Sequence, residues 1–166
     1  MTPEARARQT IDALLTAAGW HVCNVANANL HAGSGAVKGI AIREFPLNPG
    51  HGFADYLLYV NGKACGVIQA KKEGAILSGV EVQSARYAQG LPAALPAWRW
   101  PLPVVFESTG VETRFANGLE PAPRARTNAE ANTGMERFFA MACRVLCIEL
   151  TCNKRTDEHE VSTGRN

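Results

Sequence analysis

The hydrophobic pattern of the first twenty residues predicts an amphipathic helix. Thr2-Pro3-Glu4 has the hydroxyl cap, the proline and the acid that are typical of a first helical turn, and Gly19 is a typical end. The apolar positions that recur at helical spacing are Ile11, Leu14, Leu15 and Ala18. Glu4 lies seven residues before Ile11, so we expect its carboxylate to lie toward the interior side of this helix.

Alternating and apolar runs then predict strands. Residues 20–25 form a short candidate strand, which a polar, glycine-rich loop separates from a second one at 37–45. The runs at 53–60 and 63–70 are joined by Asn61-Gly62, the strongest two-residue hairpin signal in the chain. Three consecutive strands, the last two in a tight hairpin, are therefore expected after the helix.

A second helix and a further strand follow. The S-x-x-E capping box at Ser78–Glu81 predicts a helix that runs to about Gly90. After a proline-rich stretch, residues 104–108 are another candidate strand, and 111–115 are a possible fifth. The order αβββαβ predicts an α/β fold in which a mixed sheet is flanked by helices.

The character of the chain changes near residue 120. Residues 121–126 have the proline, alanine and arginine content of a linker, so we expect one domain over residues 1–126. Residues 127–166 are expected to form a divergent C-terminal extension. Apolar spacing predicts a helix within it at about 135–150, followed by a polar tail.

Composition narrows the class of protein. A chain of 166 residues with 46% hydrophobic content is long enough to bury one core, and a net charge of +2 neither announces nor excludes a nucleic-acid binder. The apolar runs are too short for a membrane span, and the first residues lack the apolar segment of a signal peptide, so we expect a cytoplasmic protein. The five cysteines form no CxxC pair, which favours reduced, buried thiols over a zinc site.

The predicted hairpin carries polar residues that an apolar sheet does not need. Gln69 and Lys71 flank Ala70 on the returning strand and therefore share a face, and the tight turn brings Asp55 of the first strand close to them. Carboxylate and amide oxygens are suitable ligands for a hard cation such as Mg²⁺, and a lysine can hold a water or stabilise a pentavalent phosphate. The same residues also fit an exposed strand end with a salt bridge between Asp55 and Lys71.

Two residues of the second predicted helix add to this pattern. Gln83 and Tyr87 are four residues apart and so share one face of the helix. An apolar stripe of Val80, Tyr87 and Leu91 would explain the tyrosine as a core residue, but it leaves Gln83 unexplained.

These motifs resemble a known family. Gly52-Phe53-Ala54-Asp55 followed by Val67–Lys72 resembles the PD-(D/E)XK nuclease motif, and the Gln83–Tyr87 segment is similar to the QxxxY motif of type I restriction enzymes. Over about residues 3–126 the chain closely resembles the N-terminal nuclease domain of a type I restriction endonuclease R subunit. The resemblance implies a PD-(D/E)XK core that hydrolyses phosphodiester bonds of double-stranded DNA with Mg²⁺ or Mn²⁺.

The resemblance also implies roles for individual residues. Asp55 corresponds to the metal-binding aspartate and Lys71 to the motif lysine, while Gln69 would assist the metal through its carbonyl oxygen. The implied supporting residues are Gln83, Tyr87 and Glu4.

Basic and histidine residues near the motif are candidates for DNA contact. His51 lies four residues before Asp55 and can approach a phosphate, although a solvated loop histidine fits as well. Lys72 and Arg86 would belong to a basic rim with Lys38, Arg43 and Lys63, for which a scattered, solvated surface is the alternative.

The chain departs from the family in three ways. Gln69 stands where most members have glutamate, and a neutral amide is a weaker ligand, so we expect a lower metal affinity. The sequence has no G-x-x-x-x-G-K-S/T loop, so no ATP site and no translocase are expected in this chain. The resemblance ends near Asn128, as a truncated gene would explain.

We therefore predict a nuclease module of a restriction-modification system, with methyltransferase and specificity subunits as its partners. A truncated, catalytically silent remnant is one alternative. A module that only docks to DNA or to the other subunits is another.

Overall fold

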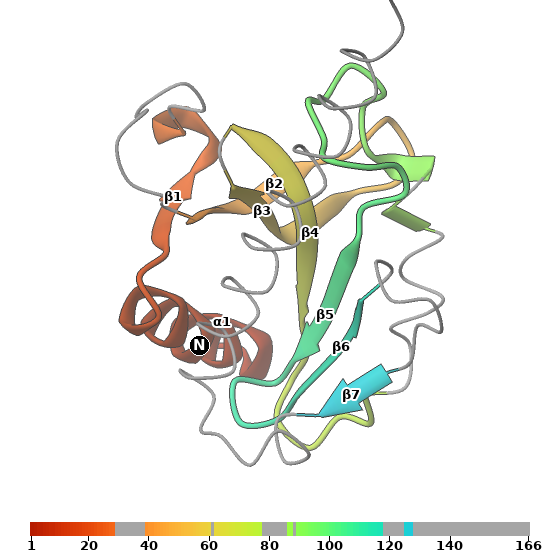
Figure 1. Cartoon of the computed structure of the whole chain (residues 1–166). Helices are drawn as coiled ribbons and strands as arrows, with labels where there is room; N and C mark the ends of the chain where they lie inside the picture. The colour runs from red at the N-terminus through yellow and green to blue at the C-terminus, as the bar shows by residue number, and fades with distance from the viewer. Residues whose placement is uncertain (29–38, 61, 78–85, 88, 118–124, 128–166) are drawn as a thin grey trace, which may run out of the picture.

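The computed structural model describes residues 1–28, 39–60, 62–77, 86–87, 89–117 and 125–127 (Figure 1). Its elements, in chain order, are α1 (Pro3–Ala17), β1 (His21–Asn24), the 3-10 turn η1 (Val25–Asn27), β2 (Gly39–Pro46), β3 (Phe53–Val60), β4 (Lys63–Ala70), β5 (Val104–Ser108), β6 (Thr113–Asn117) and β7 (Ala125–Thr127). The described strands form one sheet in the order β1-β2-β3-β4-β5-β6-β7.

The sheet is mixed, as the sequence predicts. β1 and β2 are parallel, β4 and β5 are parallel, and the remaining neighbours are antiparallel. The bounds of the hairpin strands β3 and β4 agree with the prediction, because only two residues, typical of a tight turn, separate them in the sequence. β6 begins two residues later than predicted, because Thr109 and Glu112 close the preceding turn through a 2.9 Å backbone hydrogen bond.

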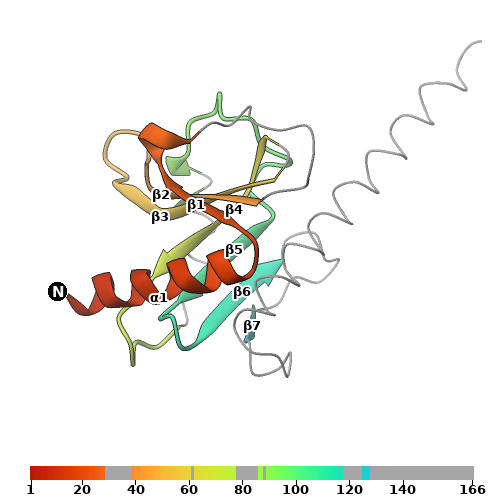
Figure 2. The same ribbon diagram turned by 90° about the vertical axis from the view of Figure 1, so that its left-hand side faces the viewer.

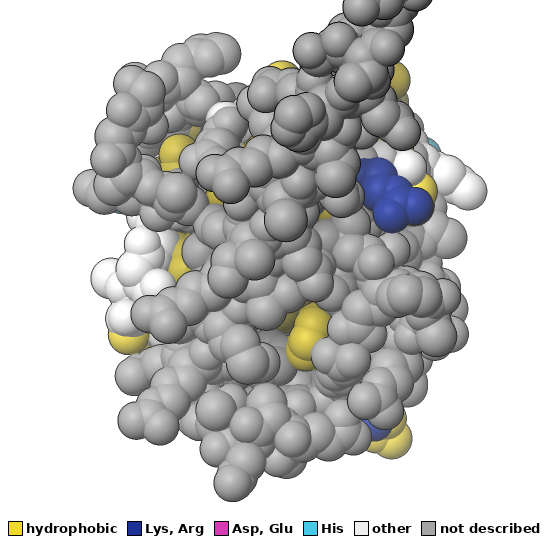
Figure 3. Space-filling model, viewed as in Figure 1, with side chains coloured by type: hydrophobic (Ala, Val, Ile, Leu, Met, Phe, Trp, Pro, Cys, Tyr) yellow, Lys and Arg dark blue, Asp and Glu magenta, His cyan; other side chains and the backbone are white. Residues whose placement is uncertain are grey.

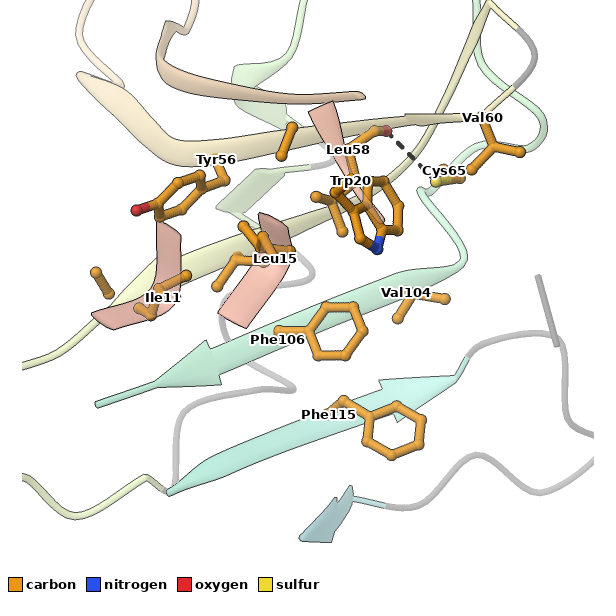
Figure 4. Packing of buried hydrophobic residues seen from close by; sticks show 13 residues of the cluster. Ile11, Leu15, Trp20, Tyr56, Leu58, Val60, Cys65, Val104, Phe106 and Phe115 are labelled. Carbon is orange, nitrogen blue, oxygen red and sulfur yellow. Dashed lines mark hydrogen bonds between the residues drawn. The ribbon is translucent and has the colours of Figure 1, made fainter. Parts of the chain in front are cut away.

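Helix α1 covers one face of the sheet (Figure 2). The side chain of Thr2 caps the helix by accepting a hydrogen bond from the backbone N–H of Ala5. The residues that α1 buries, Ala7, Ile11 and Leu15, recur every four positions and so form one stripe. This stripe packs against side chains of β3, β4, β5 and β6, where Phe106 and Phe115 stack with their ring centroids 5.6 Å apart (Figure 4).

A second group of buried side chains includes alternate residues of the same strands. Leu57, Tyr59 and Val67 belong to it, together with Tyr87 and Leu91. Since successive side chains of a strand point to opposite faces, this group covers the face away from α1. Both faces of the central strands are therefore buried, which is compatible with an α/β nuclease-like fold.

Two expectations from the sequence are wrong. Glu4 is exposed and does not lie toward the interior, because the amino end of α1 extends past the strands (Figure 2) and has no sheet beneath it. Ala125 and Arg126 were expected in a linker, but they form part of β7, which pairs with the edge of β6. Backbone groups at a sheet edge readily accept such an additional strand.

Some predictions fall on residues that the structure does not describe. Of the helix predicted at 78–90, only residues 86–87 and 89–90 are described, and they are helical. The helix predicted at 135–150 and the polar tail lie outside the described residues. Cys23 and Cys65 are buried thiols outside any disulfide, as predicted, whereas the other three cysteines are not described. No described helix has the length and apolarity needed to cross a membrane.

Candidate metal and nuclease site

The candidate site lies where strands β3 and β4 stop pairing. The last paired residues at this end are Tyr56 and Ile68, and Asp55 is the next residue along β3. One carboxylate oxygen of Asp55, Oδ2, accepts a hydrogen bond of 3.0 Å from the backbone N–H of Ala70. The carboxylate is thereby fixed between Gln69 and Lys71, which confirms the prediction that the hairpin brings these residues together.

Helix α1 contributes a cation that the sequence did not reveal. The Arg8 Nε atom lies 3.2 Å from Asp55 Oδ1, close enough for an ion pair but without the alignment of a hydrogen bond. Its Nη1 atom donates to Glu44 Oε1 at 2.8 Å. Among the described residues, Asp55 thus forms its ion pair with Arg8 and not with Lys71. A simple salt bridge between Asp55 and Lys71 does not describe this site.

Tyr56 positions the helix that carries Arg8. Its buried hydroxyl lies 2.8 Å from Asp12 Oδ1 and 3.0 Å from the carbonyl oxygen of Arg8. Arg43 of β2 also donates to both oxygens of Asp12. Asp12 and Tyr56 therefore connect α1 to the sheet within one turn of Arg8, so the position of this guanidinium depends on tertiary contacts.

Glu44 of β2 is an acid on the strand that neighbours Asp55. The β2–β3 register pairs Arg43 with Tyr56 and Phe45 with Ala54, which places Glu44 opposite Asp55. The backbone of Glu44 has a left-handed φ of 48°, a conformation that non-glycine residues rarely adopt. Strained backbone of this kind is concentrated at functional sites, so the irregularity supports the location of the site.

The local environment raises the pKa of Asp55 above its usual value. Burial is the largest cause, and the negative charge of Glu44 adds to it. The hydrogen bond from Ala70 and the positive charges of Arg8 and Lys71 act in the opposite direction without cancelling the effect of burial. A partly buried carboxylate whose charge is incompletely compensated is a favourable place for a cation.

Gln69 presents an oxygen that no donor satisfies. Its Oε1 atom is buried and has no hydrogen-bond partner. Leaving such an acceptor unpaired costs about 1 to 3 kcal/mol, which a bound cation would offset. The described residues contain no cluster of three His, Cys, Asp or Glu side chains suited to a metal. An amide oxygen beside the Asp55 carboxylate nevertheless fits the oxygen preference of Mg²⁺ and Mn²⁺.

Lys71 extends the pairing of β4 with β5. Its backbone N–H donates to the carbonyl oxygen of Ser108 at 2.8 Å, and its side chain is half-buried. Its charge is close enough to Asp55 to favour the ionised carboxylate. The lysine is thus placed on the same side of the hairpin end as the two oxygen donors.

Tyr87 is a core residue, as one of the two interpretations of the sequence proposed. It is 2% exposed and packs in the same buried group as Leu91. Burial, followed by the negative charges of Asp55 and Glu107, raises the pKa of its phenol to about 12. Tyr87 therefore lies near the acids of the site. Gln83 and Val80 lie outside the described residues.

The turn between β2 and β3 is attached to the segment that carries Tyr87. Arg86 Nη2 donates to the carbonyl oxygen of His51 at 3.0 Å, and the N–H of Asn48 donates to the carbonyl oxygen of Gly90 at 2.7 Å. These bonds connect the loop before Asp55 to the helical segment on the second face of the sheet. His51 is half-buried, while Lys72 and Arg86 are exposed.

The described basic residues do not all face solvent freely. Arg43 is bound to Asp12, and the ammonium of Lys63 lies 4.9 Å from the ring centroid of Trp98. On the face seen in Figure 3, the described side chains show separate hydrophobic areas and Lys or Arg atoms near the right-hand edge. The predicted rim is thus reduced, among described residues, to Lys72 and Arg86 as exposed candidates.

Comparison with known proteins identifies the segment that contains the site. Residues 29–102 match the family model described as the second domain of the type I restriction enzyme EcoKI endonuclease subunit. This range includes Asp55, Gln69 and Lys71. No curated protein and no solved structure shows a significant match to the chain. For residues 29–102, the match supports the predicted resemblance to the N-terminal region of a type I restriction enzyme R subunit.

Proposed function

We propose that this chain is the Mg²⁺- or Mn²⁺-dependent DNA endonuclease module of a type I restriction enzyme R subunit. It would hydrolyse phosphodiester bonds of double-stranded DNA. The observation that carries the proposal is the convergence of Asp55, Gln69 and Lys71 at the open end of the β3–β4 hairpin, within the segment that matches the family.

Each of these residues has a chemical task in the proposal. The Ala70 N–H orients the Asp55 carboxylate, and the unpaired oxygen of Gln69 provides a neutral second donor. A bound Mg²⁺ would supply Lewis-acid polarisation of the scissile phosphate and a more acidic water. The Lys71 ammonium would stabilise the negative charge that develops on the phosphate, or orient the attacking water.

The remaining residues would act around this centre. Tyr87 would support the site from the buried face, and Glu4 and Gln83 are the other supporting residues that the resemblance implies. His51, Lys72 and Arg86 would contact the DNA backbone, to which Arg and Lys contribute sequence-independent affinity. Selection of the DNA sequence would lie with a specificity subunit of a multi-subunit restriction complex.

A catalytically silent, docking form of the same domain is the second candidate. Two observations favour it. The usual acid is replaced by Gln69, and the charge of Asp55 is already partly compensated by Arg8 at 3.2 Å. A site that relies on a neutral amide and a cation-paired aspartate binds divalent ions more weakly than two free carboxylates would.

Calorimetric titration of the full chain with Mn²⁺ and Mg²⁺ tests the proposal. We expect saturable binding to the native protein and loss of binding in Asp55→Ala and Asp55→Asn, the second of which keeps an acceptor for the Ala70 N–H. The exposed acid Glu73 is the matched control, and Glu73→Gln should bind as the native chain does.

Cleavage of supercoiled DNA by the native chain and by Gln69→Glu follows in the presence of the partner subunits. Metal binding that depends on Asp55 supports the nuclease. If neither native protein nor Gln69→Glu binds either ion, the nuclease proposal fails and the silent form replaces it.

A further inference from the structure

We propose that Glu107 of β5 is a further ligand of the cation site and supplies the carboxylate that is lacking at position 69. This inference rests on the proposed function, because it concerns the same cation. It assigns a role to a residue outside the three sequence motifs. The site would then contain two carboxylates and one amide oxygen, from three adjacent strands.

The strand register places Glu107 directly beside Gln69. β4 and β5 are parallel, and the Cα partner of Gln69 is Glu107. Partners in adjacent strands are about 5 Å apart, and their side chains leave the sheet on the same face. The glutamate therefore projects beside the amide whose oxygen is unpaired.

Burial distinguishes Glu107 from an ordinary surface acid. The residue is 2% exposed, whereas Glu112, five residues further on, is exposed. A fully buried acid needs a partner in the protein or a metal, and Glu107 does have a further interaction within the protein. On its other side Glu107 is opposite Arg114 of β6, whose Nη1 donates to the carbonyl oxygen of Leu77. The test must therefore separate a structural ionic role from a ligand role.

Tyr87 is close to both acids, and this observation does not depend on the strand register. Its pKa is raised by the charges of both Asp55 and Glu107, so both carboxylates act on one phenol. Asp55 lies at the end of β3 and Glu107 on β5, with Gln69 of β4 between these strands. The unpaired oxygen of Gln69 thus has a carboxylate on the neighbouring strand on each side.

The charge of the site supports the same assignment. A hard divalent cation binds more tightly as the number of charged oxygen ligands rises. Asp55 alone provides one negative charge, which Arg8 partly compensates. With Glu107 the site has two, the number that an aspartate and a glutamate of the usual motif would provide. Gln69 can then act as a neutral donor between them.

The test is a calorimetric titration with Mn²⁺ of the native full-length chain and four variants. Glu107→Gln keeps the size of the side chain and removes its charge, so its dissociation constant should increase at least about tenfold. Gln69→Glu restores a carboxylate on the adjacent strand, and the double variant Gln69→Glu/Glu107→Gln should regain affinity close to that of the native protein. Glu112→Gln is the matched control, with unchanged affinity expected.

A structural role of Glu107 predicts a different pattern. In that case Glu107→Gln would lower the unfolding temperature while the Mn²⁺ affinity of the folded protein stayed within about twofold of native. Rescue by Gln69→Glu would then be absent. This result overturns the proposal and leaves the metal site of Asp55 intact. If the native chain binds no Mn²⁺, this inference fails. The proposed function fails with it only if Gln69→Glu also binds neither Mn²⁺ nor Mg²⁺.

A measurement on the native chain covers the possibility that Glu107→Gln does not fold. With ¹³C-labelled glutamate and aspartate, the side-chain carboxyl resonance of Glu107 should shift on addition of Mg²⁺ and saturate together with that of Asp55. The resonance of Glu112 should not move. Saturation of the Asp55 signal with no shift at Glu107 would overturn the proposal.

Discussion

Two tyrosines of β3 allow a test of how the hydrogen bond of a buried hydroxyl stabilises this fold. Tyr56 and Tyr59 are both fully buried and lie three residues apart on one strand. The hydroxyl of Tyr56 lies 2.8 Å from the Asp12 carboxylate, whereas the hydroxyl of Tyr59 has no hydrogen-bond partner. Replacing each by phenylalanine removes the same atom from two different environments.

The two substitutions are expected to change the free energy of unfolding differently. A hydrogen bond to a charged group contributes about 1.5 to 3 kcal/mol. Asp12 keeps its bonds from Arg43 after Tyr56→Phe, so the acceptor is not left unpaired. The loss of unfolding free energy should therefore lie at the lower end, about 1.5 to 2 kcal/mol. Tyr59→Phe removes an unsatisfied buried hydroxyl, and its stability should be unchanged or about 1 kcal/mol higher.

Urea unfolding followed by tryptophan fluorescence measures both changes. The two variants should have the native m-value, so that a shift of the midpoint reports stability alone. A loss below about 0.5 kcal/mol for Tyr56→Phe, within the range of neutral surface substitutions, would refute the anchoring of α1 through Asp12. An equal loss in both variants would refute the distinction between a satisfied and an unsatisfied hydroxyl.

The remaining predictions concern pH, packing and the charge of the site. The pKa values of all three tyrosines are raised by burial, two of them to about 12, so the folded state holds these protons more tightly than the unfolded chain does. The free energy of unfolding should therefore fall as pH rises from 10, the ordinary tyrosine value, toward 12, by about 1.4 kcal/mol per pH unit for each ionisable phenol. The prediction holds if tyrosinate absorbance appears only with unfolding or after it. The prediction is wrong if tyrosinate forms near pH 10 while the protein is still folded. Gly66→Ala would place a Cβ atom 2.6 Å from the backbone oxygen of Val104 and should cost about 1 to 3 kcal/mol in urea unfolding, so a neutral effect would contradict the β4–β5 register. Arg8→Met removes a positive charge that lowers the pKa of Asp55, so this pKa should rise further in a carboxyl NMR titration. An unchanged value would mean that the ion pair is not formed in solution.

The proposed cation site depends on several elements of the fold. The hairpin alone brings Asp55 to Gln69, but the charge around them comes from α1, β2 and β5. Arg8 and Glu44 compensate each other at 2.8 Å, so the net charge near Asp55 depends on how α1 is docked. Changes in the core beneath α1 are therefore expected to affect metal affinity as well as stability.

The sequence alone was sufficient for the parts that depend on local interactions. The turn chemistry of Asn61-Gly62 predicted the β3–β4 hairpin. The register at its open end, where Asp55 meets Gln69, also depends on a register shift between Leu58 and Tyr59, which the sequence did not show. The cap at Thr2 and the apolar stripe of α1 could also be predicted, because each depends on residues within a few positions of one another.

The tertiary structure decided everything that depends on long-range packing. Arg8 and Asp55 are far apart in the chain, and only the docking of α1 makes them an ion pair. Glu107 became a neighbour of Gln69 because β5 pairs in parallel beside β4, a choice that no local pattern contains. The exposure of Glu4 followed from where the sheet ends beneath the helix. Helical spacing defines which side of a helix is apolar, but the extent of the surface that covers this side is set by the rest of the fold.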